Sequence, residues 1–152
     1  MRGIIRGMLG TEGVDDVAQD VFLRFYRSLE NFKGDSALGT YLGRIAINTS
    51  LNAIAKRKQR RWLPWTTLEE FQAKAQIDPA QSPERADLRE TLQLALSHLP
   101  EEQRAVVVLR LIEGYSVSET AAMLNVAEGT VASRLSRAQR ALRTFLQPLL
   151  NE

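Results

Sequence analysis

Apolar residues recur every three or four positions through most of the chain, which is the spacing of one face of an α-helix. The first such stretch predicts a helix over residues 14–32, with Thr11 as its N-cap. Its apolar positions are Val14, Val17, Val21, Phe22, Phe25 and Leu29. After a break at residues 33–36, the pattern predicts a second helix that starts near Leu38 and runs into the basic residues 56–61.

Residues 62–87 lose this periodicity and contain several prolines, so we interpret them as a flexible linker. The prolines are Pro64, Pro79 and Pro83. After the linker, leucines at helical spacing predict a third helix that ends at Pro100. These leucines are Leu88, Leu92, Leu96 and Leu99. Pro100 and the two glutamates that follow it predict the first turn of a fourth helix, which ends near Gly114.

No segment shows the alternation of apolar and polar residues that a half-buried strand requires. The chain has 152 residues, enough for one ordinary domain or two small ones. We therefore predict an all-α fold of two small helical domains, residues 1–61 and residues 88–152, joined by the linker.

The most specific local pattern begins at Ser116. Ser116 and Glu119 have the spacing of a capping box, which satisfies free amide groups at the start of a helix. Asn125 follows the short helical stretch of residues 120–124 and tolerates the left-handed conformation that ends a helix. A second helix then starts near Glu128, and the small Ala121 permits close approach of the two. This combination predicts a helix-turn-helix.

The second helix of this motif has one apolar stripe and one arginine face. The stripe consists of Val131, Leu135, Ala138, Leu142, Phe145 and Leu146. Arg137, Arg140 and Arg143 fall opposite the stripe, Arg134 lies on the flank, and no acid occurs from Thr130 to the end of the helix. Such a face also occurs on helices that are merely solvated, but together with the turn pattern it favours docking on duplex DNA.

The polar side of the first helix and the segment after it supply further candidates. Asp16, Gln19, Asp20 and Leu23 form a face that either binds a protein partner or is an ordinary helix surface. Short polar groups near Phe32 and Tyr41 have the composition of a pocket for an unstacked base, although they also fit ordinary surface positions. These groups are Lys33, Asp35, Ser36, Asn48 and Asn52. The basic run that contains Lys56 and Arg57 is equally consistent with a polyanion contact and with a solvated helix end.

Composition argues against most kinds of chemistry. The chain has no cysteine and one histidine, so we predict no catalytic residue, no metal ligand and no cofactor. It shows no leader-like segment and no long apolar run, which predicts a cytoplasmic protein without membrane insertion. The formal net charge is +2, but the positive residues cluster in two blocks, and clustering is what a polyanion requires.

With these patterns in place, nearly the whole chain resembles an extracytoplasmic-function (ECF) sigma factor of the sigma-70 family. Residues 15–23 resemble conserved region 2.2, and residues 32–36 with 40–48 resemble regions 2.3 and 2.4. Residues 99–138 resemble region 4, which is the most specific match. Region 2.1 is expected to be shortened, because only ten residues precede Thr11. The chain departs from the usual pattern at Leu38, Gly39, Asn125 and Ala132.

The resemblance implies that the chain directs core RNA polymerase to promoters and helps to melt them. It implies contacts to the −35 (upstream) element by Thr130, Ser133, Arg134, Arg137 and Arg140. It implies contacts to the −10 (downstream) element by Lys33, Asp35, Ser36, Tyr41, Asn48, Asn52, Lys56 and Arg57. It implies contacts to the polymerase β′ clamp helices by Asp16, Gln19, Asp20 and Leu23, a further contact to the β flap, and control by an anti-sigma factor.

Three other functions fit parts of the pattern. A helix-turn-helix regulator that acts without polymerase would use the first domain for a ligand or for dimerisation. A recombinase with a helix-turn-helix tail would need a convergent catalytic set, which the first domain lacks. A sigma-like protein that sequesters a partner would fail to open promoter DNA.

Overall fold

The computed structural model describes residues 1–61 and 83–150, and these contain helices and no strand. The predicted all-α fold is confirmed. The helical elements are α1 (Arg2–Leu9), α2 (Val14–Ser28), η1 (Leu29–Asn31), α3 (Leu38–Arg61), α4 (Pro83–Ser97), α5 (Glu101–Val107), η3 (Val108–Ile112), α6 (Val117–Leu124) and α7 (Glu128–Leu150). Residues 62–82, which make up most of the predicted linker, lie outside the described part of the chain. No described helix is long and apolar enough to cross a membrane.

The helices α1, α2 and α3 form an amino-terminal lobe, residues 1–61, in which each helix packs on the other two. Thr11 was predicted to cap α2, and this prediction is wrong. The N-cap is Gly13, which has a left-handed conformation with φ 69°. The turn from α1 into α2 needs this backbone geometry, which glycine adopts without a steric penalty. The Arg57 side chain of α3 secures the turn by donating to the Glu12 carbonyl at 2.9 Å.

The buried side of α2 is narrower than its apolar pattern predicts. Val14 and Val21 are buried, as expected, and Ala18 is buried with them. Phe22, although next to Val21, is 58% exposed, and Leu29 in η1 is also exposed. Apolar side chains therefore remain on the surface of the second half of α2 and of η1.

The carboxy-terminal lobe, residues 83–150, contains α4 to α7. α4 begins at Pro83, before the predicted start near Leu88, because proline is compatible with the first turn of a helix. Leu96 and Leu99 pack in a core cluster with Val107 and Ala138. Leu88, predicted on the same face, is 70% exposed, so the outer half of α4 lies beyond this cluster.

α5 continues into η3, a π-helical turn. The Glu113 amide donates to the Val108 carbonyl at 2.9 Å, five residues back. The segment around the junction of α5 and η3 is deeply buried, and Val106, Val108 and Leu109 are fully enclosed. The predicted end of this helical segment near Gly114 is confirmed, since Gly114 adopts φ 78° and begins the connection to α6.

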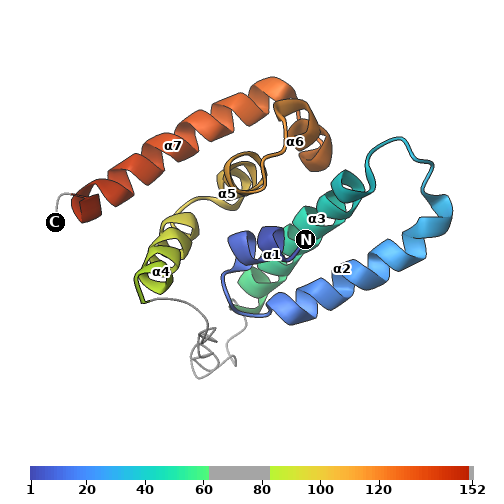
Figure 1. Ribbon diagram of the computed structural model, residues 1–152, viewed down its shortest axis with the longest axis horizontal. Helices are drawn as coiled ribbons and strands as arrows, with labels where there is room; N and C mark the ends of the chain where they lie inside the picture. Colours follow the sequence, from blue (N-terminus) through green and yellow to red (C-terminus); the bar gives the residue numbers. More distant parts are fainter. Residues whose placement is uncertain (62–82, 151–152) are drawn as a thin grey trace.

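The two lobes share one hydrophobic core. The largest buried cluster joins Ile4, Ile5, Met8 and Ile47 of the amino-terminal lobe to residues of α5, η3 and α6. The latter are Ala105, Val108, Leu109 and Met123. In Figure 1, α2 and α7 lie on opposite sides of the molecule, with α1, α3 and α5 between them. The lobes are thus packed against each other and are not separate bodies in this structure.

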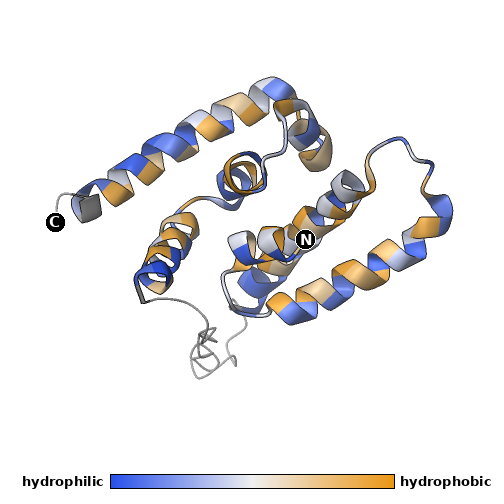
Figure 2. Cartoon of the chain, viewed as in Figure 1, coloured by the Kyte–Doolittle hydropathy of each residue, from blue (hydrophilic) through white to orange (hydrophobic). Residues whose placement is uncertain are grey.

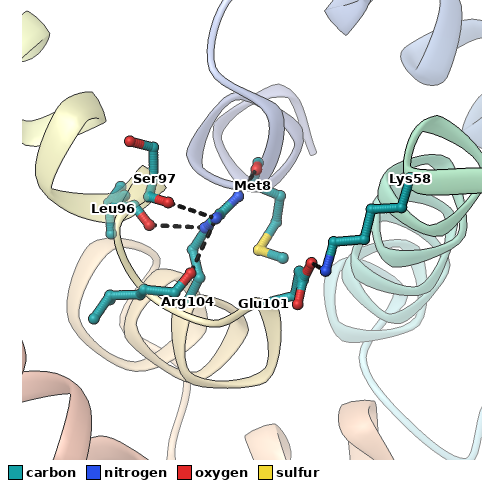
Figure 3. A network of polar contacts seen from close by, with 7 residues as sticks. Met8, Lys58, Leu96, Ser97, Glu101 and Arg104 are labelled. Carbon is teal, nitrogen blue, oxygen red and sulfur yellow. Dashed lines mark hydrogen bonds and ion pairs between the residues drawn. The ribbon is translucent and has the colours of Figure 1, made fainter. Parts of the chain in front are cut away.

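Arg104 of α5 ties α5 to α4 and also bonds one residue of the amino-terminal lobe. Its guanidinium donates to the carbonyl oxygens of Met8 at 2.8 Å, Leu96 at 2.8 Å, Leu99 at 3.0 Å and Ser97 at 3.1 Å (Figure 3). These carbonyls lie at or beside the carboxyl ends of α1 and α4, which carry partial negative charge. Burial lowers the pKa of Arg104, and the nearby Glu101 carboxylate opposes this shift.

Candidate nucleic-acid interface

The helix-turn-helix has the capping predicted from the sequence. The Glu119 amide donates to the Ser116 hydroxyl at 3.0 Å, and the Ser116 amide donates to the Glu119 carboxylate at 2.7 Å. Asn125 ends α6 in the left-handed conformation, with φ 54° and ψ 50°. The Val126 amide then bonds the Ala121 carbonyl at 3.0 Å, which directs the chain into α7. Each of these local predictions is confirmed.

An apolar wedge fixes the angle between α6 and α7. Val106, Ala121 and Val131 are buried together, with Leu124, Val126 and Leu135 packed against them. Ala121 has no side chain beyond its methyl group, so α6 and α7 come close at this point. The predicted stripe of α7 is confirmed in full, because all of its members are buried or half-buried. α7 therefore presents its other side outward (Figure 2).

The outward side of α7 carries the arginines. Arg137, Arg140 and Arg143 are exposed, as their positions opposite the stripe predict. Arg134 differs, since its side chain is 20% exposed and pairs with Glu102 at 2.9 Å. Arg134 thus contacts α5, a pairing that the sequence analysis did not predict. The face remains strongly positive without it.

Two further candidates lie in the first turns of α7. Thr130 is half-buried, and its carbonyl accepts a hydrogen bond from the exposed Ser133 hydroxyl at 3.0 Å. Both residues lie in the first two helical turns of α7, directly after the connection from α6. The amino-terminal turns of a recognition helix are the ones that approach base edges when such a helix docks in the major groove.

The loop before α3 is built around an aromatic contact. The rings of Phe32 and Tyr41 lie 4.8 Å apart, and Phe25 stands 6.3 Å from Tyr41. The candidate loop residues Lys33, Asp35 and Ser36 are all exposed. The aromatic rings therefore gather beside a loop whose polar candidates are open to solvent.

Asn48 and Asn52 have different surroundings although they are one turn apart on α3. The Asn48 side-chain amide donates to the Arg44 carbonyl at 2.8 Å and to the Met123 carbonyl of α6 at 3.3 Å. Asn52 instead lines a groove of about 320 Å³ between α2 and α3. Both side chains are exposed, but Asn52 lines this groove whereas Asn48 contacts α6.

This groove joins two sets of candidates that were predicted to have separate roles. Its walls include Asp16, Asp20, Asn52, Lys56 and Arg57. The acids come from α2 and the bases from α3, and Asp20 pairs with Arg24 at 3.0 Å on its own helix. Gln19 and Leu23, the other candidates on α2, are exposed.

Sequence reasoning missed the residues that hold α6 against α3. The Tyr115 hydroxyl donates to the Gly39 carbonyl at 3.4 Å, and Met123 is buried against the amino-terminal lobe. Burial, with smaller contributions from Glu113 and Glu119, raises the pKa of Tyr115. Apolar residues in helices predict that a face is buried, but not which helix covers it, so no sequence signal identified this contact. Within residues 1–61 and 83–150, no three metal-ligating side chains come together.

Comparisons with known proteins match both lobes. The model of sigma-70 region 2 matches residues 1–61, and the model of sigma-70 region 4 matches residues 89–142. The RNA polymerase sigma-H factor of Pseudomonas aeruginosa is 40% identical over 156 residues, covering 98% of this chain and 81% of that protein. The ECF RNA polymerase sigma-E factor of Escherichia coli K12 is 35% identical over 144 residues, covering 90% and 75%.

Two solved structures share the fold. The sigma factor RpoE of Bartonella quintana, in complex with the anti-sigma factor NepR, superposes with a TM-score of 0.74 at 24% identity, over 96% of this chain and 89% of that one. CnrH, in complex with the cytosolic domain of CnrY, gives a TM-score of 0.68 at 25% identity, over 97% and 80%. The chain therefore belongs to the sigma-70 family of RNA polymerase sigma factors, in its ECF group, and its function is in transcription initiation.

Proposed function

We propose that the chain recruits core RNA polymerase to promoters by binding two separated DNA elements, and that it opens the downstream element through binding energy without a chemical step. The −35 element docks on α7, the −10 element docks on α3 and the loop before it, and the polymerase β′ clamp helices dock on α2. The observation that carries this proposal is the exposed arginine face of α7. α7 is the second helix of the helix-turn-helix, and the first helix, α6, is capped at both ends.

For the upstream element, the contacts are Thr130, Ser133, Arg134, Arg137 and Arg140. The exposed Arg137 and Arg140 are placed to meet the phosphate backbone and release counterions. Arg134 reaches DNA by exchanging its partner Glu102, itself exposed, for a phosphate. Ser133 and Thr130, near the start of α7, are oriented toward base edges by the docking geometry of this motif.

For the downstream element, an unstacked base is held beside the Phe32 and Tyr41 rings. Base stacking on an aromatic ring contributes about 1–3 kcal/mol, enough to offset much of the cost of unstacking. The candidate polar contacts are Lys33, Asp35, Ser36, Asn48 and Asn52, and Lys56 and Arg57 hold the adjoining backbone.

For polymerase, Asp16, Gln19, Asp20 and Leu23 form the contact on α2. The surrounding surface is unusually apolar, since Phe22 and Tyr26 are exposed on the same helix. An exposed apolar patch rimmed by polar groups is typical of a protein-binding surface. The β flap is proposed to contact the carboxy-terminal lobe. An anti-sigma factor is proposed as a regulatory partner, as in the complex of RpoE with NepR.

In this proposal residues 1–61 bind polymerase and the downstream element, residues 62–87 join the two units, and residues 88–152 bind the upstream element. When two weak binding sites are joined in one chain, binding at the second site becomes intramolecular. The affinity of the whole chain therefore exceeds the affinity of either site alone. The site of action is the cytoplasm, where polymerase and DNA are present.

The test is co-migration of the purified chain with sigma-free bacterial core polymerase, followed by transcription from a random promoter pool. We expect a holoenzyme that initiates at a shared pair of elements. A folded chain that binds duplex DNA but not core polymerase would refute the proposal in favour of a helix-turn-helix regulator that acts alone.

A further inference from the structure

One arginine of the proposed upstream-element face is held by an acid from another helix. Arg134 pairs with Glu102, and the Arg134 side chain is 20% exposed whereas that of Glu102 is 70% exposed. Arg137, Arg140 and Arg143 are exposed on the same helix. Within residues 1–61 and 83–150, none of these three arginines forms an ion pair. The arginines of α7 therefore differ in how freely they can move toward DNA.

Arg134 lies between the two kinds of contact that are proposed for α7. At about 100° per residue, it is about 40° around the helix from Thr130 and about 60° from Arg137. α5 packs against α7, so its residue Glu102 stands at the edge of the face that docks on DNA. Because the Glu102 carboxylate is 2.9 Å from the guanidinium, it repels any phosphate that approaches Arg134 from solvent.

This pair breaks only for an anion that is held in place. An ion pair with an exposed partner is weak, since water and salt screen it, so a fixed phosphate can replace Glu102. On a specific site, base contacts hold the duplex in one register and keep the same phosphate against Arg134. On other DNA the protein slides, so the exposed arginines follow the backbone while Arg134 stays with Glu102.

We propose that Glu102 is a selectivity residue for the upstream element, because it withholds Arg134 from DNA that is not held in the correct register. The inference rests on the proposed function for the docking of DNA on α7. It adds that an acid on α5, outside the helix-turn-helix, sets how strongly the chain prefers its element over other DNA. The quantity that changes is the ratio of specific to non-specific affinity, which decides how a promoter competes with other sequences.

The test measures binding of the full chain to two short duplexes over a range of salt concentrations. The specific duplex is one that the parent chain selects from a random pool, and the non-specific duplex is drawn from the unselected pool. The test variant is Glu102→Gln, which removes the charge and keeps the shape. The matched control is Glu101→Gln, which makes the same change in the same helical turn, but at an acid that pairs with Lys58 of α3. A second control repeats Glu102→Gln in a chain that carries Arg134→Ala, where Glu102 has no arginine to hold.

We expect Glu102→Gln to bind the non-specific duplex more tightly, because Arg134 then follows any phosphate. One additional phosphate contact steepens the salt dependence by about 0.9, which gives about eightfold tighter non-specific binding at 0.1 M salt and no gain near 1 M. The specific duplex should gain less, since Arg134 already contacts its phosphate there, so the ratio of affinities falls several-fold. The ratio should stay unchanged in Glu101→Gln, and Glu102→Gln should not alter it in the Arg134→Ala chain.

An unchanged ratio in Glu102→Gln, or an equal fall in either control, would overturn the proposal. Arg137→Ala separates this outcome from a failure of the proposed function. If Arg137→Ala weakens binding to both duplexes while Glu102→Gln leaves their ratio unchanged, α7 docks on DNA and only the role of Glu102 is wrong. If the parent chain selects no duplex, or if Arg137→Ala leaves binding unaltered, α7 is not the DNA interface and both proposals fail.

Discussion

Replacing Arg104 by methionine tests how strongly one side chain holds α5 to the carboxyl ends of α1 and α4. Methionine keeps an unbranched, apolar stem but removes every hydrogen bond of the guanidinium. Four carbonyls lose a charged donor, and three of them, on Met8, Leu96 and Leu99, are partly buried. The Ser97 carbonyl is exposed, so water replaces the lost bond there at little cost.

The magnitude follows from these three carbonyls. A hydrogen bond to a charged group contributes about 1.5–3 kcal/mol, which gives roughly 4–5 kcal/mol at the lower end of that range. The Leu96 carbonyl also accepts from the Leu99 amide at 3.1 Å, so it does not become unsatisfied. Burial of the charged guanidinium costs desolvation energy, which is why the pKa of Arg104 is lowered, and an uncharged methionine does not incur this cost. We therefore expect Arg104→Met to lower the free energy of unfolding by about 3 kcal/mol.

Urea denaturation with a constant m-value measures this loss, and the melting temperature should fall by roughly 6–12 °C. Arg104→Lys, which keeps the charge but not the fork of donors, should lose less. The control is Arg6→Met on the exposed side of α1, where a change within about 0.5 kcal/mol is expected. A loss below about 1 kcal/mol for Arg104→Met would show that water replaces the whole network.

Other predictions concern single features of the fold and site. Ser116→Ala should cost about 1 kcal/mol of stability by removing the capping box, measured by thermal unfolding. Asn125→Ala should cost about 1 kcal/mol, whereas Asn125→Gly should be neutral or stabilising, because only the alanine strains the left-handed backbone. Arg137→Ala should lower the salt dependence of duplex binding by about one unit of slope, and an unchanged slope would remove α7 from the interface. The hydrogen bond from Lys58 lowers the pKa of Glu101 below its ordinary value of 4.5. The ionised carboxylate therefore stabilises the fold above pH 4.5, and this contribution is lost as the pH falls through the lowered pKa. The free energy of unfolding of Glu101→Gln should depend less on pH in that acid range, as measured by urea denaturation.

Local structure could be predicted from the sequence because it depends on neighbours in the chain. The capping box at Ser116, the left-handed Asn125 and the arginine face of α7 each rest on a few adjacent residues, and all three are present. The roles of the candidate residues in binding DNA and polymerase remain predictions.

Packing between distant helices could not be predicted in the same way. α3 contacts α1, α2 and α6, so its apolar residues point in several directions and no single face marks the partner. Phe22 lies next to the buried Val21 and fits the apolar pattern, yet it is exposed, because adjacent residues on a helix point about 100° apart and only the packed side is covered. The pairing of Arg134 with Glu102 joins residues that are remote in sequence, which charge patterning alone cannot identify.

The shared core has a consequence for the order in which the chain is made. Ile4, Ile5 and Met8 leave the ribosome early, but Val108, Leu109 and Met123, which complete their burial, are synthesised 47 to 62 residues after α3 ends at Arg61. At about 5–20 residues per second, that interval lasts roughly 2–12 s. During this time the nascent amino-terminal lobe exposes an apolar surface that chaperones can bind. Translation speed across the intervening segment should therefore influence how much of the protein reaches its folded state.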